Sequence, residues 1–172
     1  VEDFADAGHG YDELGLHGAA VARAAALAGP LYDHYFRVAS HGHEHLPATG
    51  PAILIANHSG MLPLDGAMLW LDVLRRTGRT LRPVGDHFVS SLPLVGTWFA
   101  RTGVVNGTRA NVRWLLERGA LLAIFPEGTA GVAKPPRERY RLQRWTVGHA
   151  ELAIRHRVPI VPVAVVGAEE AW

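Results

Sequence analysis

Three short runs of apolar residues divide the sequence and constrain its fold more than any other feature. They are PAILIA at residues 51–56, LLAIF at 121–125 and VPIVPVAVV at 158–166. Short, nearly continuous apolar runs bounded by turn residues are typical of strands that are covered on both faces. None of the runs approaches the ~20 residues that a helix needs to cross a bilayer. A buried sheet is therefore expected, and a transmembrane protein is excluded for this stretch of chain.

Segments with helical character lie between these runs. The clearest follows Thr108, a residue type that often caps helices, and carries Val112, Leu115 and Leu116 at helical spacing before Gly119. The other expected helices cover residues 18–28, 65–76, 88–101 with an interruption at Pro93, and 142–156. Strands that alternate with helices predict an α/β fold with a largely parallel central sheet flanked by helices.

Further details complete this prediction. The first helix is expected to end at residues 29–30, a Gly-Pro pair, and a short second helix is expected around residues 31–36. Another strand is expected near residues 81–84. Pro159 and Pro162 place the last strand at an edge or a bulge of the sheet, because proline has no N–H to donate.

The composition fits a single domain over residues 1–172, with residues 1–37 as an N-terminal helical extension. Of the 172 residues, 48% are hydrophobic and 19% are charged, so the chain can bury a sizeable core. Cysteine is absent, which excludes a disulfide scaffold, a thiol nucleophile and thiolate metal sites. The acidic start VEDFADAGHG lacks the basic and apolar regions of a signal peptide.

Positive charge is unevenly distributed, although the net charge is only +1. Residues 75–113 contain seven arginines against one carboxylate, Asp86, and residues 134–157 contain seven basic residues against Glu138 and Glu151. The planar guanidinium of arginine suits phosphate and carboxylate groups. The pattern fits anionic partners such as phosphate esters, a coenzyme tail or a lipid headgroup. A genomic base composition that favours arginine explains it equally well.

One chemically interesting loop, NHSGMLPLD, follows the first apolar run. It places His58 at the end of the expected strand and Asp65 at the start of a helix. A histidine can take a proton from a hydroxyl at neutral pH, and a carboxylate on its other ring nitrogen would fix the tautomer. The alternative is a polar turn in which Asp65 only caps the helix.

A second loop, FPEGT at residues 125–129, follows the second apolar run. Glu127 and Gly128 place a carboxylate and a closely approachable backbone at the end of a strand. Such an arrangement can hydrogen-bond a polyol substrate, because glycine leaves room for it. The alternative is a turn with a solvated glutamate. In a parallel sheet, ligands bind beyond the carboxyl ends of the strands, which is where both loops are expected.

The two loops belong to a set of four sequence blocks. The blocks are NHSGMLPLD at 57–65, GVVNGTR at 103–109, FPEGT at 125–129 and VPIVPVAV at 158–165. In residue types and order they resemble the glycerolipid acyltransferase family, the lysophosphatidate and lysophospholipid acyltransferases. The resemblance runs from about Tyr35 to the end of the chain, and it implies a glycerol-phosphate acyltransferase-like fold.

This resemblance implies an acyltransferase that works by general-base catalysis. In the family, the histidine deprotonates an acceptor hydroxyl, which then attacks the thioester of acyl-CoA or acyl carrier protein without an acyl-enzyme intermediate. By this resemblance His58 is the base and Asp65 is its orienting partner. The acceptor is a lysophospholipid such as lysophosphatidate, or another glycerolipid. The residues expected to bind it are Arg109, Glu127, Gly128 and Thr129.

The resemblance also implies partners and a location. No metal and no bound cofactor are expected, since the acyl thioester is a cosubstrate, and no nucleic-acid partner is expected. An enzyme of phospholipid biosynthesis must meet a bilayer, so a cytoplasmic protein with peripheral membrane attachment is expected. Family members usually continue beyond the fourth block, so truncation at the C-terminal end is a further expectation.

Two features depart from the family's pattern. Six residues separate His58 from Asp65, where the family usually has four, so the loop containing Pro63 must bulge for the carboxylate to return. The alternative orienting carboxylate is Asp86, whose other interpretation is a helix N-cap. In the second block, residues 106–107 (Asn-Gly) replace a common apolar pair, which would fit an acceptor without a phosphate.

Two other segments have competing interpretations. Strand alternation in HGHEH at 41–45 would place three histidines on one face, where they could bind zinc, but its place at the entry to the sheet favours a structural or solvated role. The basic run KPPRERYRLQR at 134–144 could contact coenzyme A phosphates, lie on anionic lipid or be a solvated loop. The longer loop between His58 and Asp65 suggests a non-catalytic lipid-binding member of the fold as one alternative to an enzyme, and the histidines suggest a metal-binding module as the other.

Overall fold

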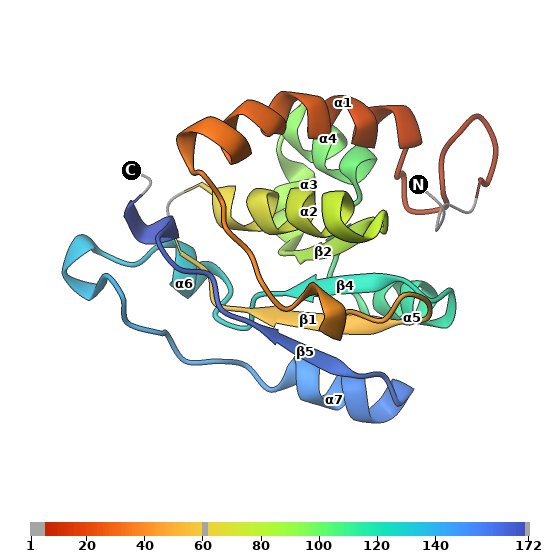
Figure 1. Ribbon diagram of the computed structural model, residues 1–172. Coiled ribbons are helices and arrows are strands. Elements are labelled where there is room, and N and C mark those ends of the chain that lie inside the picture. Colours follow the sequence, from red (N-terminus) through yellow and green to blue (C-terminus); the bar gives the residue numbers. More distant parts are fainter. Residues whose placement is uncertain (1–5, 60–61, 171–172) are drawn as a thin grey trace.

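All strands described in the computed structural model, which covers residues 6–59 and 62–170, run parallel in one sheet (Figure 1). The sheet has five strands in the order β3-β2-β4-β1-β5. Their bounds are Ala52–Ala56 (β1), Leu81–Gly85 (β2), Val105–Asn106 (β3), Leu121–Ile124 (β4) and Ile160–Val163 (β5). The predicted α/β fold with a parallel central sheet is confirmed.

Helices cover both faces of this sheet. In Figure 1, α1, α2 and α4 lie above it, whereas α7 lies below it. The α-helices are Gly18–Pro30 (α1), Leu64–Thr77 (α2), His87–Ser91 (α3), Val95–Thr102 (α4), Arg109–Glu117 (α5), Thr129–Val132 (α6) and Gly148–His156 (α7). Shorter helical turns are Leu31–Tyr35 (η1), His43–His45 (η2), Pro136–Glu138 (η3) and Ala168–Glu170 (η4). Within the described ranges, no helix has both the length and the apolarity to cross a bilayer.

The central strands contribute side chains to two separate cores. Leu54 and Leu121 pack in the core that contains α1 and α2. Their neighbours Ile53 and Leu122 pack on the opposite face with residues of α5 and α7. All four side chains are at most 1% exposed, and alternate residues of a strand point to opposite faces. The continuous apolar runs therefore arise because helices cover both faces of the sheet.

The described part of the N-terminal segment begins with a loop. Residues 1–5 lie outside the described residues, and residues 6–17 form a loop before α1. The Gly-Pro pair does not end the first helix, because the backbone N–H of Leu31 bonds to the carbonyl of Ala28 and the chain continues into the π-helical turn η1. The expected short helix around residues 31–36 is thus a continuation of α1.

The expected helix at residues 142–156 begins only at Gly148. The backbone N–H groups of Gln143 and Thr146 donate to Glu127 and Pro126 instead of forming helical hydrogen bonds, so this part of the chain is an extended loop. The two-residue strand β3 was too short to be recognised in the sequence. The last strand is shorter than expected, and it lies at an edge of the sheet, as its prolines predict.

The histidine-rich segment is a 3-10 turn, η2, and not a strand, so strand alternation does not group its histidines. The ring Nε2 of His43 lies 2.9 Å from the carboxylate of Asp72 on α2. In the part of the chain that the structure describes, no group of three or more histidine or carboxylate side chains is arranged to hold a metal ion.

Asp72 joins the segment before β1 to helix α2. Its buried carboxylate accepts hydrogen bonds from the hydroxyls of Tyr32 and Ser40, at 2.5 and 2.6 Å, in addition to the contact with His43. Burial raises the pKa of Asp72, but the hydrogen bonds from Ser40, Tyr32 and His43 outweigh burial and leave the pKa below its ordinary value. This network fixes the helix whose first turn carries Asp65.

A second buried ion pair anchors the N-terminal loop to the sheet. Arg82, on β2, donates through Nη1 to the carboxylate of Asp12 at 2.6 Å, and both side chains are at most 6% exposed. The other carboxylate oxygen of Asp12 accepts from the backbone N–H groups of Leu14 and Leu16. Burial lowers the pKa of Arg82, and the charge of Asp12 opposes this shift. The loop before α1 is thus tied to a central part of the fold.

Candidate active site

The loop after β1 is tied to the loop after β5. The side-chain amide of Asn57 donates to the backbone carbonyl of Val165 at 2.9 Å, and the N–H of Val165 donates back to the Asn57 side-chain oxygen at 2.7 Å. This pair of hydrogen bonds fixes the chain immediately before His58. Sequence reasoning did not assign this role to Asn57, although the residue belongs to the first block.

His58 and Asp65 form a close pair at this edge of the sheet. The ring Nδ1 of His58 lies 2.6 Å from Oδ2 of Asp65, whose side chain is fully buried, while the imidazole remains 13% exposed. The same carboxylate accepts from the backbone N–H groups of Ser59 at 2.9 Å and Gly66 at 2.7 Å. A carboxylate is a hydrogen-bond acceptor, so this contact assigns Nδ1 as the donor and leaves Nε2 as the other ring nitrogen.

The two additional residues between histidine and aspartate do not prevent this contact. Residues 60–61 of the loop lie outside the described residues, and α2 begins at Leu64, so Asp65 occupies the first helical turn. Asp86, the alternative partner, caps α3 by accepting the backbone N–H of His87 at 2.5 Å. Asp65 is thus the carboxylate that contacts His58.

The floor of the site is closely packed. The imidazole of His58 lies against the ring of Phe125, with 4.4 Å between ring centroids and 32° between planes. Gly131, in α6, approaches the backbone so closely that a Cβ there would lie 2.9 Å from the carbonyl oxygen of His58. Only glycine fits at this position without displacing the histidine, and no motif in the sequence marked it.

Glu127 lies beneath the loop that carries His58. The residue is 4% exposed. One of its carboxylate oxygens accepts the backbone N–H of His58 at 2.9 Å, and the other accepts that of Gln143 at 2.6 Å. The carboxylate therefore joins the loop after β1 to the long loop after β4. This contact gives Glu127 a positioning role for the histidine.

For the acyl transfer that the four sequence blocks predict, we expect Glu127→Gln to lower the rate by about 100-fold, because a displacement of about 1 Å at a reacting group can have that effect. An amide can accept only one of the two N–H groups and turns its own donors toward the other. Measuring kcat and KM separately tests this prediction, since displacement of His58 lowers kcat.

The matched control is Glu117→Gln, because the carboxylate of Glu117 is largely exposed on α5 and lies 3.8 Å from Arg113. The control should leave both constants unchanged. An unchanged kcat in Glu127→Gln would show that the buried hydrogen bond does not position His58.

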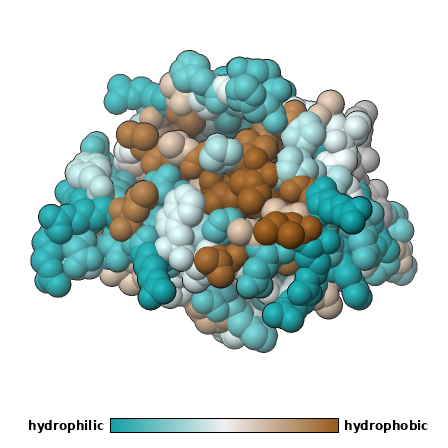
Figure 2. Space-filling model, turned by 90° about the horizontal axis from the view of Figure 1, so that it is seen from below, coloured by the Kyte–Doolittle hydropathy of each residue, from teal (hydrophilic) through white to brown (hydrophobic). Residues whose placement is uncertain are grey.

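The other residues expected at the acceptor site are exposed. Gly128 has φ 57° and ψ −145°, a conformation that is essentially restricted to glycine, and Thr129 begins α6. Arg109 begins α5 and lines a groove of about 540 Å³ between α5 and α7, whose apolar lining includes Val112 and Leu152. Figure 2 views the molecule from below and shows apolar residues gathered across the middle of this side, with hydrophilic residues around them.

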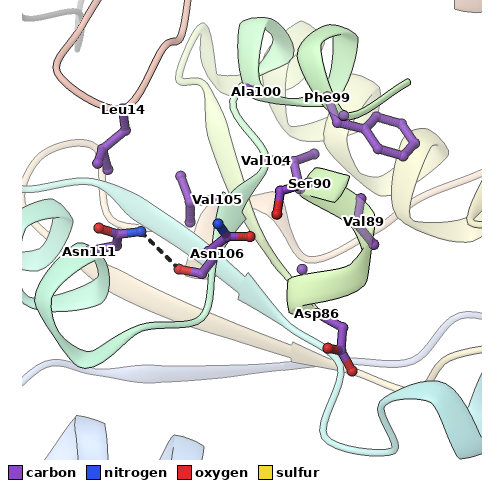
Figure 3. A pocket seen from close by; sticks show the side chains of 12 residues that line it. Leu14, Asp86, Val89, Ser90, Phe99, Ala100, Val104, Val105, Asn106 and Asn111 are labelled. Atoms are coloured by element: carbon purple, nitrogen blue, oxygen red, sulfur yellow. Dashed lines mark hydrogen bonds between the residues drawn. The ribbon is translucent and has the colours of Figure 1, made fainter. Parts of the chain in front are cut away.

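A separate cavity of about 100 Å³ lies between β3, α4 and the N-terminal loop (Figure 3). Its lining includes Leu14, Phe99 and Asn106, and the side-chain amide of Asn111 donates to the backbone carbonyl of Asn106 at 3.2 Å. Its lining contains neither His58 nor Asp65. This cavity is therefore distinct from the histidine site.

The fold and the site together define a class: α/β proteins with a histidine–carboxylate pair beyond the carboxyl end of a parallel strand. A family model described as Acyltransferase matches residues 37–166. The chain belongs to the glycerolipid acyltransferase family. The resemblance seen in the four sequence blocks is confirmed.

Relatives in bacteria and animals share this domain. An uncharacterized protein of Mycobacterium tuberculosis is 37% identical over 154 residues, covering 86% of this chain and 43% of the relative. One from Mycobacterium leprae is 40% identical over 145 residues, covering 83% of this chain and 40% of the relative. The human "DGAT1/2-independent enzyme synthesizing storage lipids" is 35% identical over 125 residues, covering 72% of this chain and 38% of the relative.

The chain thus spans about two fifths of the length of these relatives. No solved structure matches it.

Proposed function

We propose that the chain is a lipid acyltransferase domain, which transfers a fatty acyl group from acyl-CoA or acyl carrier protein to a hydroxyl of a glycerolipid. The observation that carries the proposal is the 2.6 Å contact between His58 Nδ1 and the buried carboxylate of Asp65. With Nδ1 bonded to this carboxylate, Nε2 is the ring nitrogen that supports the proposal of a general base. Membership of the acyltransferase family supplies the reaction class.

The proposed reaction needs no acyl-enzyme. Nε2 of His58 takes the proton of the acceptor hydroxyl as its oxygen attacks the thioester carbonyl carbon. The new C–O bond forms, the C–S bond breaks, and the imidazolium returns the proton to the leaving thiolate. The carboxylate of Asp65 stabilises the transient imidazolium and keeps its orientation.

The acceptor is proposed to approach over the exposed part of the loop after β4. Gly128 and Thr129 are exposed there, next to the buried Glu127. Arg109 is the cation proposed for a phosphate of the acceptor, and it is also exposed. Lysophosphatidate and other lysophospholipids are the first candidates. The names of the animal relatives, which refer to synthesis of storage lipids, support neutral glycerides as the second candidates.

Acceptor-dependent ester formation tests this proposal. We expect the protein to release thiol from long-chain acyl-CoA only when lysophosphatidate, a lysophospholipid or a mono- or diglyceride is added. Mass spectrometry should identify the acylated acceptor in the same reaction. Acyl carrier protein loaded with the same chain is the second donor.

The alternative is a member of the fold that binds lipids without turning them over. Binding of a fatty acyl thioester without ester formation, for every acceptor and both donors, would favour this alternative and contradict the proposed enzyme. Cytoplasmic location with peripheral membrane attachment belongs to the same proposal, since both donors are cytoplasmic and the acceptor is a lipid.

A further inference from the structure

Several large apolar side chains that are exposed in the described chain lie in the loops that follow strands. They include Leu62 after β1, Leu94 after β2, Leu142 after β4 and Val166 after β5, each at least 62% exposed. In a parallel sheet the carboxyl ends of the strands share one edge, and His58 follows one of them. Exposed apolar side chains gathered on one side of a protein mark a surface that contacts a partner or a membrane.

The loop between α6 and α7 adds positive charge to this edge. We name residues 134–147 the arginine loop (the light blue loop in Figure 1). Its sequence, KPPRERYRLQRWTV, contains four arginines and one carboxylate, Glu138. Tyr140, Leu142 and Val147 are 66%, 66% and 69% exposed between these cations. Exposed cations interleaved with aromatic and aliphatic side chains are the composition of an interfacial membrane segment.

Buried contacts hold the arginine loop in place. The ammonium group of Lys134 forms a buried ion pair with Glu169 of η4 and donates to the backbone carbonyl of Arg141 at 3.1 Å. The other carboxylate oxygen of Glu169 accepts the backbone N–H of Tyr140 at 2.5 Å. Lys134 and the backbone at Tyr140 and Arg141 are thus bonded to one another and to η4, whereas the four arginines of the loop are exposed.

The loop is also joined directly to the candidate active site. Glu127 accepts the backbone N–H of Gln143 through one oxygen and that of His58 through the other. A surface that contacts the arginine loop therefore lies close to the edge at which His58 acts. This connection favours a role of the loop at the site over the alternative of a solvated basic segment.

We propose that the arginine loop docks on an anionic lipid bilayer. Its arginines contact lipid phosphates, and Tyr140, Leu142 and Val147 enter the headgroup region. Positive charge on the loop complements the negative surface, and the exposed apolar side chains fit the adjoining acyl layer. The inference deepens the proposed function, because it holds the His58 edge at the surface in which a lipid acceptor dissolves.

Co-sedimentation with vesicles tests this surface without relying on activity. The protein should bind vesicles that contain about 30% phosphatidylglycerol in phosphatidylcholine more tightly than vesicles of phosphatidylcholine alone. Arg141→Gln/Arg144→Gln should weaken binding by about 30-fold, since each cation near an anionic surface contributes a factor of about five. Leu142→Ser should also weaken binding. Circular dichroism and thermal unfolding check that each variant is folded.

Matched controls remove the same groups elsewhere. Arg23→Gln/Arg113→Gln removes two other exposed arginines, one on α1 and one on α5. Ile154→Ser removes an aliphatic side chain that is 79% exposed on α7. Both controls should bind vesicles as the unmodified protein does. Equal binding by the loop variants and the controls would overturn the proposal, as would no binding to anionic vesicles.

Two further measurements distinguish membrane docking from the proposed enzyme activity and from a binding site for coenzyme A. His58→Ala should bind vesicles as the unmodified protein does. Loss of acyl transfer with retained vesicle binding would therefore support the docking surface. If the arginine variants instead lose affinity for soluble coenzyme A while vesicle binding is unchanged, the loop is an anion site for the donor and not a membrane surface.

Discussion

Replacing His58 with alanine is expected to lower acceptor-dependent thiol release by at least about 100-fold, the low end of the range for a general base. The reason is local: Nδ1 of the ring is bonded to Asp65, so Nε2 is the ring nitrogen that remains to accept the hydroxyl proton. The assay follows thiol release from long-chain acyl-CoA with and without the acceptor that supports turnover.

His45→Ala is the matched control for this prediction, because the side chain of His45 is 75% exposed and lies 3.9 Å from Glu44, its neighbour in the chain. Its activity should equal that of the unmodified protein. Asp65→Asn should also reduce the rate, since an amide can present a donor to Nδ1 and favour the wrong tautomer. Thiol release that persists in His58→Ala would contradict the general-base mechanism.

The second large effect is expected on stability. Asp12→Ala should lower the free energy of unfolding by about 3–5 kcal/mol, because it leaves the buried guanidinium of Arg82 without its carboxylate. Within the described residues Nη2 of Arg82 is already buried without a hydrogen-bond partner, and Nε donates to the uncharged carbonyl of Gly103, so these groups compensate the charge only weakly. Urea unfolding measured by circular dichroism gives the value.

Two companion variants test the cause of this loss. Asp12→Ala/Arg82→Met removes both charges and should recover a substantial part of the stability, because a buried pair can be replaced by apolar side chains. Asp33→Ala breaks the exposed pair of Asp33 and Arg75 and should have a much smaller effect. A double variant as unstable as Asp12→Ala would show that the N-terminal loop depends on the hydrogen bonds of Asp12 and not on its charge.

Much of the fold could be predicted because its determinants are local. The apolar runs at 51–56 and 121–125 became adjacent central strands, since their composition requires burial on both faces. Thr108 caps α5 through its hydroxyl, which accepts the N–H of Asn111 at 3.2 Å. The helix expected from residue 142 was wrong at its start because the backbone N–H groups of Gln143 and Thr146 donate to Glu127 and Pro126, which lie 16 and 20 residues earlier in the sequence.

The candidate site, like the fold, was predictable from the sequence only in part. Residue types and spacing in the sequence alone selected His58 and two possible carboxylate partners, because a strand end followed by a helix start is a local pattern. Only the tertiary structure decided between Asp65 and Asp86, since the choice depends on the path of the loop that includes Pro63. It also gave Glu127 a role beneath the histidine, which no spacing could reveal.

The sequence by itself therefore determined the longer strands of the sheet, the family and the candidate histidine, because hydrophobic periodicity and short motifs are properties of neighbouring residues. The tertiary structure alone decided which carboxylate pairs with which basic side chain: Asp12 with Arg82, Asp72 with His43, and Glu169 with Lys134. These pairs join residues 29 to 70 positions apart. Their stability depends on burial, which the chain acquires only when the layers pack.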